Sequence, residues 1–191
     1  MNWLTLYARS RQVPVSAALV ALVALTVWFL NEGSAAGPSA GPVAVLVLTG
    51  NVAAATVGLA GQDVALDRTA AIRWAFRRAL HVLLIGAFAG GALLAVQAAG
   101  PELLPTALVV RDSAGLAGLA ALGVALGGTT YAWILPTGWL ALTFFVPPLP
   151  GLAGEIGGWM VLSPATTVSG AIPWAMLATG TLLYAVLGPK R

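Results

Sequence analysis

Hydrophobic residues form long uninterrupted stretches along most of this chain, and polar residues gather between them. The stretches are continuous over roughly 17–22 residues, which is the length that an α-helix needs to cross about 30 Å of hydrocarbon. Every backbone polar group in a bilayer needs an internal partner, and continuous runs of this length favour helices over the alternating strands of a barrel. The pattern predicts an all-α helix bundle with about six transmembrane helices, near residues 14–30, 43–60, 80–99, 106–127, 131–146 and 170–188.

Three segments interrupt this series of crossings. Residues 1–13 mix tryptophan and tyrosine with two arginines, which is typical of a short helix in the headgroup layer. A cleaved signal peptide, with Ser34-Ala35-Ala36 as a loose cleavage site, is the competing interpretation. Residues 147–169 are apolar but rich in proline and glycine, so no single helix fits them. Non-helical backbone at membrane depth must be covered by protein or a water-filled cavity, and we therefore expect a re-entrant segment.

The third interruption, residues 61–79, is the only strongly charged stretch of the chain. Asp63, or Thr69 with the apolar run that follows it, is a suitable helix cap. Ile72 and the residues four and eight positions later share one face of a helix, with Arg73 on an adjacent stripe. Such an amphipathic helix lies on anionic lipid, docks into a partner, or only marks the cytoplasmic side, and the pattern alone leaves these alternatives open.

The charged residues predict the topology. With six crossings and both termini in the cytoplasm, eight of the nine basic residues fall inside, and Arg111 is the exception. Glu32, Glu102 and Glu155 fall outside, one in each outer loop. We therefore expect a multi-pass protein of the inner cell membrane that contacts membrane lipids.

Composition narrows the chemistry. The chain is 59% hydrophobic and 8% charged, whereas a soluble domain carries about a quarter charged residues. It has no cysteine and one histidine, which excludes thiolate chemistry, cysteine-ligated metals and a bis-histidine haem. We expect no catalytic residue and no metal site. The net charge of +3 comes from residues that flank hydrophobic spans, so nucleic acid is not an expected partner.

Two features of the spans predict close packing and a polar element inside the bundle. Glycines at 86 and 90, and again at 115, 118, 123 and 127, permit close helix approach. Arg111 and Asp112 lie within the predicted crossing 106–127. Adjacent helical residues point about 100° apart, so these two need not pair with each other, and each can seek a partner across the bundle. A structural or gating role, simple snorkelling and substrate contact are the alternatives.

The whole arrangement resembles the permease subunits of type-2 ABC exporters, especially small actinobacterial-like members. The resemblance is carried by MNWLTLYARSR at the amino terminus, DVALDRTAAIRWAFRR between spans two and three, and PPLPGLAGEIGGWMVLSPATTVSGAIP between spans five and six. In that family these places hold an interfacial helix, a cytoplasmic coupling helix and a re-entrant excursion. The chain is short for the family, and several spans are near the minimum length.

The resemblance implies a subunit without enzymatic activity that dimerises with itself or a homologue and docks cytoplasmic ABC ATPase subunits. The chain has no Walker A motif, so ATP and magnesium would bind only in the partner ATPase. The implied coupling residues are Asp63, Leu66, Asp67, Arg68, Ile72 and Arg73. The first alternative is a non-catalytic accessory or assembly subunit of a larger membrane complex. A secondary transporter ranks third, because neither a clear midplane ionisable site nor internal repeats are visible.

Overall fold

The computed structural model describes residues 13–31, 40–59, 74–147, 149–163 and 167–189, and helices without any strand make up this part of the chain. In chain order the elements are α2 (Val13–Asn31), α3 (Ala40–Ala55), the 3₁₀ helix η1 (Thr56–Leu59), α5 (Trp74–Ala99), α6 (Thr106–Gly127), α7 (Tyr131–Phe145), α8 (Leu152–Gly157) and α9 (Thr167–Leu187). The predicted all-α class is confirmed for these residues.

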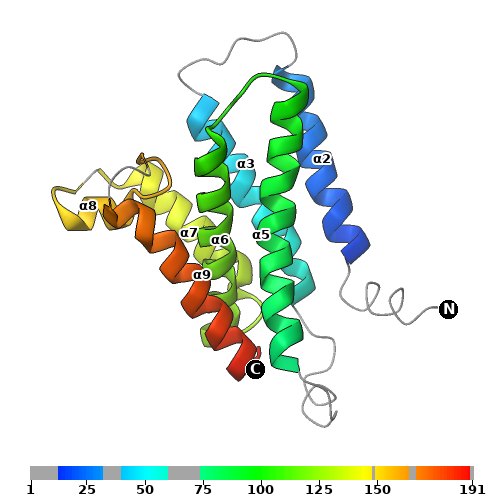
Figure 1. The fold of residues 1–191 in the computed structure, drawn as a ribbon, viewed down its shortest axis with the longest axis vertical. Coiled ribbons are helices and arrows are strands. Elements are labelled where there is room, and N and C mark those ends of the chain that lie inside the picture. The colour runs from blue at the N-terminus through cyan, green and yellow to red at the C-terminus, as the bar shows by residue number, and fades with distance from the viewer. Residues whose placement is uncertain (1–12, 32–39, 60–73, 148, 164–166, 190–191) are drawn as a thin grey trace.

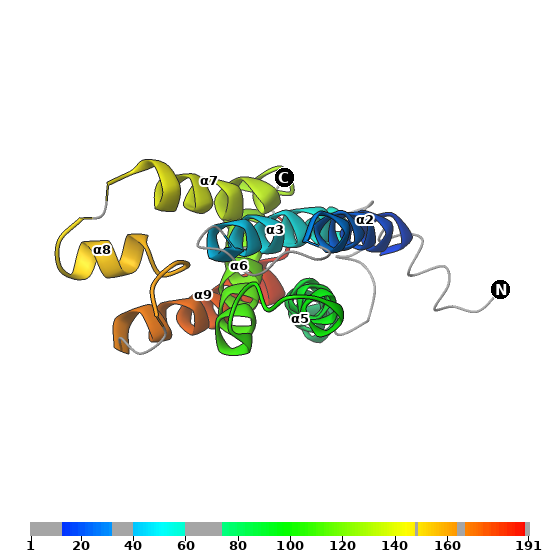
Figure 2. The ribbon, with the colours of Figure 1, turned by 90° about the horizontal axis from the view of Figure 1, so that it is seen from above.

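The long helices stand side by side in one bundle (Figure 1). Seen from above, α2 and α3 form one row, α7 lies along the outer side of α3, α5 and α9 lie on the opposite side, and α6 stands between α3 and α9 (Figure 2). Helix α6 packs against α3, α5, α7 and α9, and its longest contact is with α9. The short helix α8 lies at the periphery, next to the ends of α7 and α9.

Three of the described helices, α5, α6 and α9, are long and apolar enough to cross a membrane, and α3 and α7 are shorter apolar helices. Large hydrophobic side chains also cover the outside of the bundle. Phe145, Leu182 and Val186 are 86%, 65% and 67% exposed. A monomeric soluble protein rarely shows extended apolar surface of this kind, so the surface suits hydrocarbon better than water.

The glycines of α6 explain why this helix occupies the centre. Most of α6 is buried, whereas α5 and α9 turn most of their length outward. A Cβ atom on Gly118 would overlap the backbone of Met176 in α9, and one on Gly123 would overlap the carbonyl of Tyr131 in α7. On the other side of α6, Gly86 and Gly90 of α5 lie against Ser113 and its neighbours. The predicted close packing of this helix is confirmed.

Helix limits agree with the predicted spans except where a polar or proline-containing turn joins the helix. Helix α6 has the predicted limits, and α7 ends one residue early. Helix α5 begins at Trp74, so residues 74–79 of the predicted coupling segment belong to the same helix as the third span. Helix α9 begins at Thr167 and continues through Pro173. Residues 1–12, which belong to the predicted interfacial helix, and residues 60–73 lie outside the described residues.

Candidate functional site

A buried arginine joins α6 to the segment between α8 and α9. Arg111 lies in the second turn of α6 and is 3% exposed. Its Nη2 donates a hydrogen bond to the carbonyl of Trp159 over 2.6 Å, and its Nη1 donates to the carbonyl of Leu162 over 2.9 Å. The guanidinium therefore binds two carbonyls of a non-helical turn, a task for which its fixed fork of donors is well suited.

Asp112 neutralises this arginine. The third donor of Arg111, Nε, lies 2.7 Å from Asp112 Oδ1, and the carboxylate is fully buried. The sequence left open whether these neighbours would pair, because their Cβ atoms diverge. They do pair, since the long arginine side chain bends back while its terminal nitrogens still reach across the bundle. A buried charge without a partner is strongly destabilising, so the pair is a condition for placing Arg111 here.

Trp159 fills the space beside the guanidinium. It is fully buried, and Arg111 Cζ lies 6.0 Å from the centre of its ring, at the outer limit of a cation–π contact. A Cβ atom on Gly115 would lie 2.7 Å from Trp159 Cη2 and 2.8 Å from Pro173 Cβ. Glycine at 115 therefore lets the indole and the start of α9 both pack against the backbone of α6.

Helix α7 and the start of α9 also donate hydrogen bonds to the segment that connects these two helices. The carbonyl of Gly157 accepts from Trp139 Nε1 over 3.2 Å and from Thr143 Oγ1 over 3.1 Å. Ser169 Oγ donates to the carbonyl of Ser163 over 2.8 Å. Side chains from α6, α7 and α9 thus bind backbone carbonyls of this segment that lack a helical partner.

A second set of contacts lies at the opposite end of α9, where the chain also ends (Figure 1). Tyr184 Oη donates to the carbonyl of Leu59 over 3.1 Å, and Arg78 Nη1 lies 3.5 Å from the carbonyl of Ala185. Gly188 ends the helix with a φ of 70°, and a Cβ there would lie 2.8 Å from the Arg78 guanidinium. A cation beside the last carbonyls of a helix also complements the helix dipole.

These contacts place α9 against both flanks of residues 60–73. Leu59 is the last described residue before that segment, and Arg78 lies in the second turn of the helix that follows it. The predicted coupling residues Asp63, Leu66, Asp67, Arg68, Ile72 and Arg73 lie outside the described residues, so their roles stay predictions.

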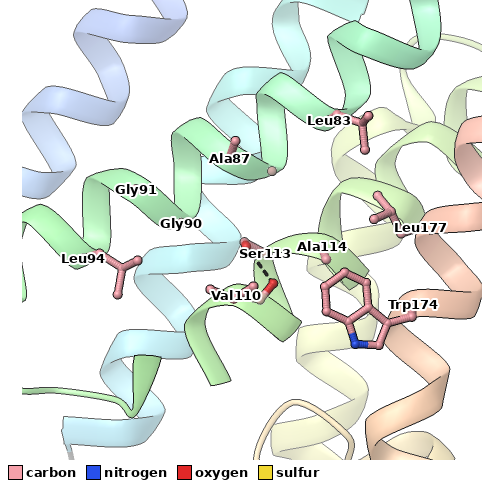
Figure 3. A pocket seen from close by; sticks show the side chains of 11 residues that line it. Leu83, Ala87, Gly90, Gly91, Leu94, Val110, Ser113, Ala114, Trp174 and Leu177 are labelled. Carbon is pink, nitrogen blue, oxygen red and sulfur yellow. Dashed lines mark hydrogen bonds between the residues drawn. The ribbon is translucent and has the colours of Figure 1, made fainter. Parts of the chain in front are cut away.

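An apolar groove of about 250 Å³ separates the upper half of α9 from α5, with α6 as its floor (Figure 3). Leu83, Ala87 and Gly91 line the α5 side, and Trp174 and Leu177 line the α9 side. The hydroxyl of Ser113 on the floor donates to the carbonyl of Val110, so it already has an acceptor. The groove exists because small residues on α5 leave the space between the two helices unfilled.

No family model, curated protein or solved structure matches this chain. Among the residues that the structure describes, no group of three or more histidine or acidic side chains could hold a metal ion.

The sequence pointed to Arg111 and Asp112 but not to the residues around them. The sequence indicates Trp159 only as part of the predicted re-entrant segment, and Tyr184 only as part of the last predicted span. The signal for Trp159 is the glycine pair before it, which commonly marks irregular backbone. For Tyr184, the signal is a phenolic hydroxyl at an otherwise apolar helix end, because a buried tyrosine hydroxyl usually has a hydrogen-bond partner.

Proposed function

We propose that this chain is the membrane-spanning permease subunit of an ABC exporter of the type-2 kind. In this proposal it crosses the cell membrane six times with both termini in the cytoplasm, forms a dimer with itself or a homologue, and docks ATPase subunits through residues 61–79. The observation that carries the proposal is the attachment of α9 to both flanks of residues 60–73, through Leu59 and Arg78. A force applied to that segment by a partner would reach a transmembrane helix directly.

The excursion between α7 and α9 supports the same proposal. A half-crossing segment needs its carbonyls satisfied by side chains, and Arg111, Trp139 and Thr143 supply such donors. Arg111 also bears on the topology. It is the one basic residue that the proposed topology places away from the cytoplasmic side, and its charge is paired with Asp112 inside the bundle. Because its charge is neutralised inside the bundle, the position of Arg111 is consistent with a topology in which the basic residues of the loops lie on the cytoplasmic side.

Docking can be tested with charges placed on the proposed apolar anchor. Leu66→Asp with Ile72→Asp is expected to leave membrane insertion intact and to abolish copurification with an ATPase in mild detergent, together with stimulated ATP hydrolysis. Buried aliphatic anchors commonly dominate such interfaces, and an aspartate in their place carries an unpaired charge into the contact.

A matched control uses the other face of the same segment. At about 100° per residue of a helix, Val64 and Ala71 project roughly opposite to the mean direction of Leu66 and Ile72. Val64→Asp with Ala71→Asp adds the same charge and is expected to copurify normally. Copurification that survives in the Leu66 and Ile72 variant would move the docking surface elsewhere. The absence of any ATPase beside the unaltered chain would favour an accessory subunit of a membrane complex.

A further inference from the structure

Helix α9 is held at its two ends, and at a crossing between them, by contacts of different kinds. At its lower end, hydrogen bonds join Tyr184 to Leu59 and Ala185 to Arg78. At its upper end, Pro173 packs against Gly115 beside the Trp159 ring. The contacts at the lower end involve the residues that flank residues 60–73. The contact at the upper end lies beside the turn that Arg111 binds. The single helix α9 thus reaches the residues at both sites described above.

Between these ends, α9 crosses α6 with backbone against backbone. A Cβ on Gly118 would overlap Met176 and Leu177, and a Cβ on Gly180 would overlap the carbonyl of Gly118. Interdigitating side chains resist rotation of one helix over another, because each side chain is held between side chains of the facing helix. A glycine-to-glycine crossing has no such side chains, so it permits a change of angle while keeping the helices in contact.

The space around α9 differs on the two sides of this crossing. Below it, Gly188 and Ala185 lie directly against Arg78 of α5. At and above it, the groove of about 250 Å³ separates Leu177 and Trp174 from Ala87 and Gly91 (Figure 3). The upper part of α9 therefore has free space toward α5, and the lower part does not.

We propose that α9 acts as a lever that pivots at the Gly118–Gly180 crossing, with its upper arm moving into and out of the groove. Displacement of Leu59 or Arg78 at the lower end changes the angle of α9 and shifts Pro173 against Trp159 at the upper end. This inference rests on the proposed function only for the source of the force, which would be the partner ATPase. The pivot, the contacts and the groove are all features of this chain.

The lever can be tested by measuring the distance between α5 and α9 with pairs of spin labels. The chain has no cysteine, so cysteines introduced at the exposed residues Ala95 and Ala171 can be labelled without other changes. The labelled chain is measured in lipid nanodiscs without any ATPase. We expect a distance distribution with more than one population, because the upper arm occupies positions inside and outside the groove.

Gly91→Leu is the variant that blocks the motion. A Cβ at Gly91 meets nothing within 4 Å, so leucine fits the fold and fills the groove, and the distribution should narrow to one population. The matched control is Gly50→Leu on α3, where a Cβ also meets nothing and the groove is not involved. This control should leave the distribution unchanged.

Tyr184→Phe tests transmission across the pivot, because it removes only the hydroxyl that binds Leu59. The ratio of the populations at the upper label pair should change by about twofold to tenfold, the range that one net hydrogen bond allows. A single narrow distribution in the unaltered chain would overturn the lever. So would populations that respond neither to Gly91→Leu nor to Tyr184→Phe. Since no ATPase is present, a lever found here stands even where no ATPase partner is found, and the exporter proposal then fails alone.

Discussion

Gly118→Leu is expected to abolish the folded bundle, whereas Gly50→Leu should leave it intact. At position 118 any side chain would enter the backbone of α9, because a Cβ atom there already overlaps Met176 and Leu177. Relief of this overlap requires the two helices to separate along their longest contact. Within a bilayer no hydrophobic driving force brings them back together, since lipid tails are as apolar as the helix surfaces.

The same overlap predicts that the loss of stability grows with the size of the side chain at position 118. Gly118→Ala adds one methyl group at the crossing and should destabilise by about 1–3 kcal/mol, the usual cost of overpacking. Gly118→Leu should yield no monodisperse protein. The measurement is unfolding of the purified protein in mixed detergent micelles, with size-exclusion chromatography as a check on assembly. A Gly118→Leu variant that purifies and unfolds like the Gly50→Leu control would show that α6 and α9 do not cross at this point.

Arg111→Leu should free the turn between α8 and α9 from α6 and destabilise the bundle by about 3–5 kcal/mol, the range for breaking a buried ion pair from one side. The substitution leaves the carbonyls of Trp159 and Leu162 without their donors and Asp112 without its counter-charge. Arg111→Lys should also lose affinity for the turn, because an ammonium group cannot bind two carbonyls and a carboxylate in this fixed fork.

The double variant Arg111→Leu with Asp112→Asn separates the charge from the hydrogen bonds to the turn. It removes the unpaired carboxylate, so it should be more stable than Arg111→Leu alone in the same unfolding measurement. Both variants should expose the turn, which limited proteolysis between Gly158 and Ser163 would detect. Normal protection of this stretch in Arg111→Leu would mean that packing of Trp159 alone holds the turn in place.

Most of the fold could be predicted from the sequence, because apolar length and glycine spacing are local signals. Helix α6 begins and ends where the hydrophobic run and its flanking proline and glycines predicted. The start of α5 was less predictable. The sequence places Arg77 and Arg78 in the predicted cytoplasmic segment, and the structure shows that they belong to α5, with Arg78 Nη1 3.5 Å from the carbonyl of Ala185 at the end of α9. That contact joins residues far apart in the chain and has no local signature.

The candidate site was predictable only in part. Charged residues in an apolar span indicated that Arg111 and Asp112 need polar partners, because an ionisable group at membrane depth is kept only with a partner. Their partners could not be predicted. The carbonyls of Trp159 and Leu162 belong to backbone, and every residue has one, so composition carries no sign of which carbonyl an arginine will bind. Tyr184 and Leu59 present the same difficulty at the other end of α9.

The most direct test of the account is the sidedness of the chain, since the re-entrant excursion and the cytoplasmic coupling segment both depend on it. Single cysteines at Glu32, Arg73 and Glu155 are treated in intact cells with a thiol reagent that cannot cross membranes. The account predicts that Glu32 and Glu155 variants react from outside and that the Arg73 variant reacts only after permeabilisation. Reaction of all three variants from the same side would contradict the six-crossing arrangement and, with it, the proposed route from the coupling segment through α9.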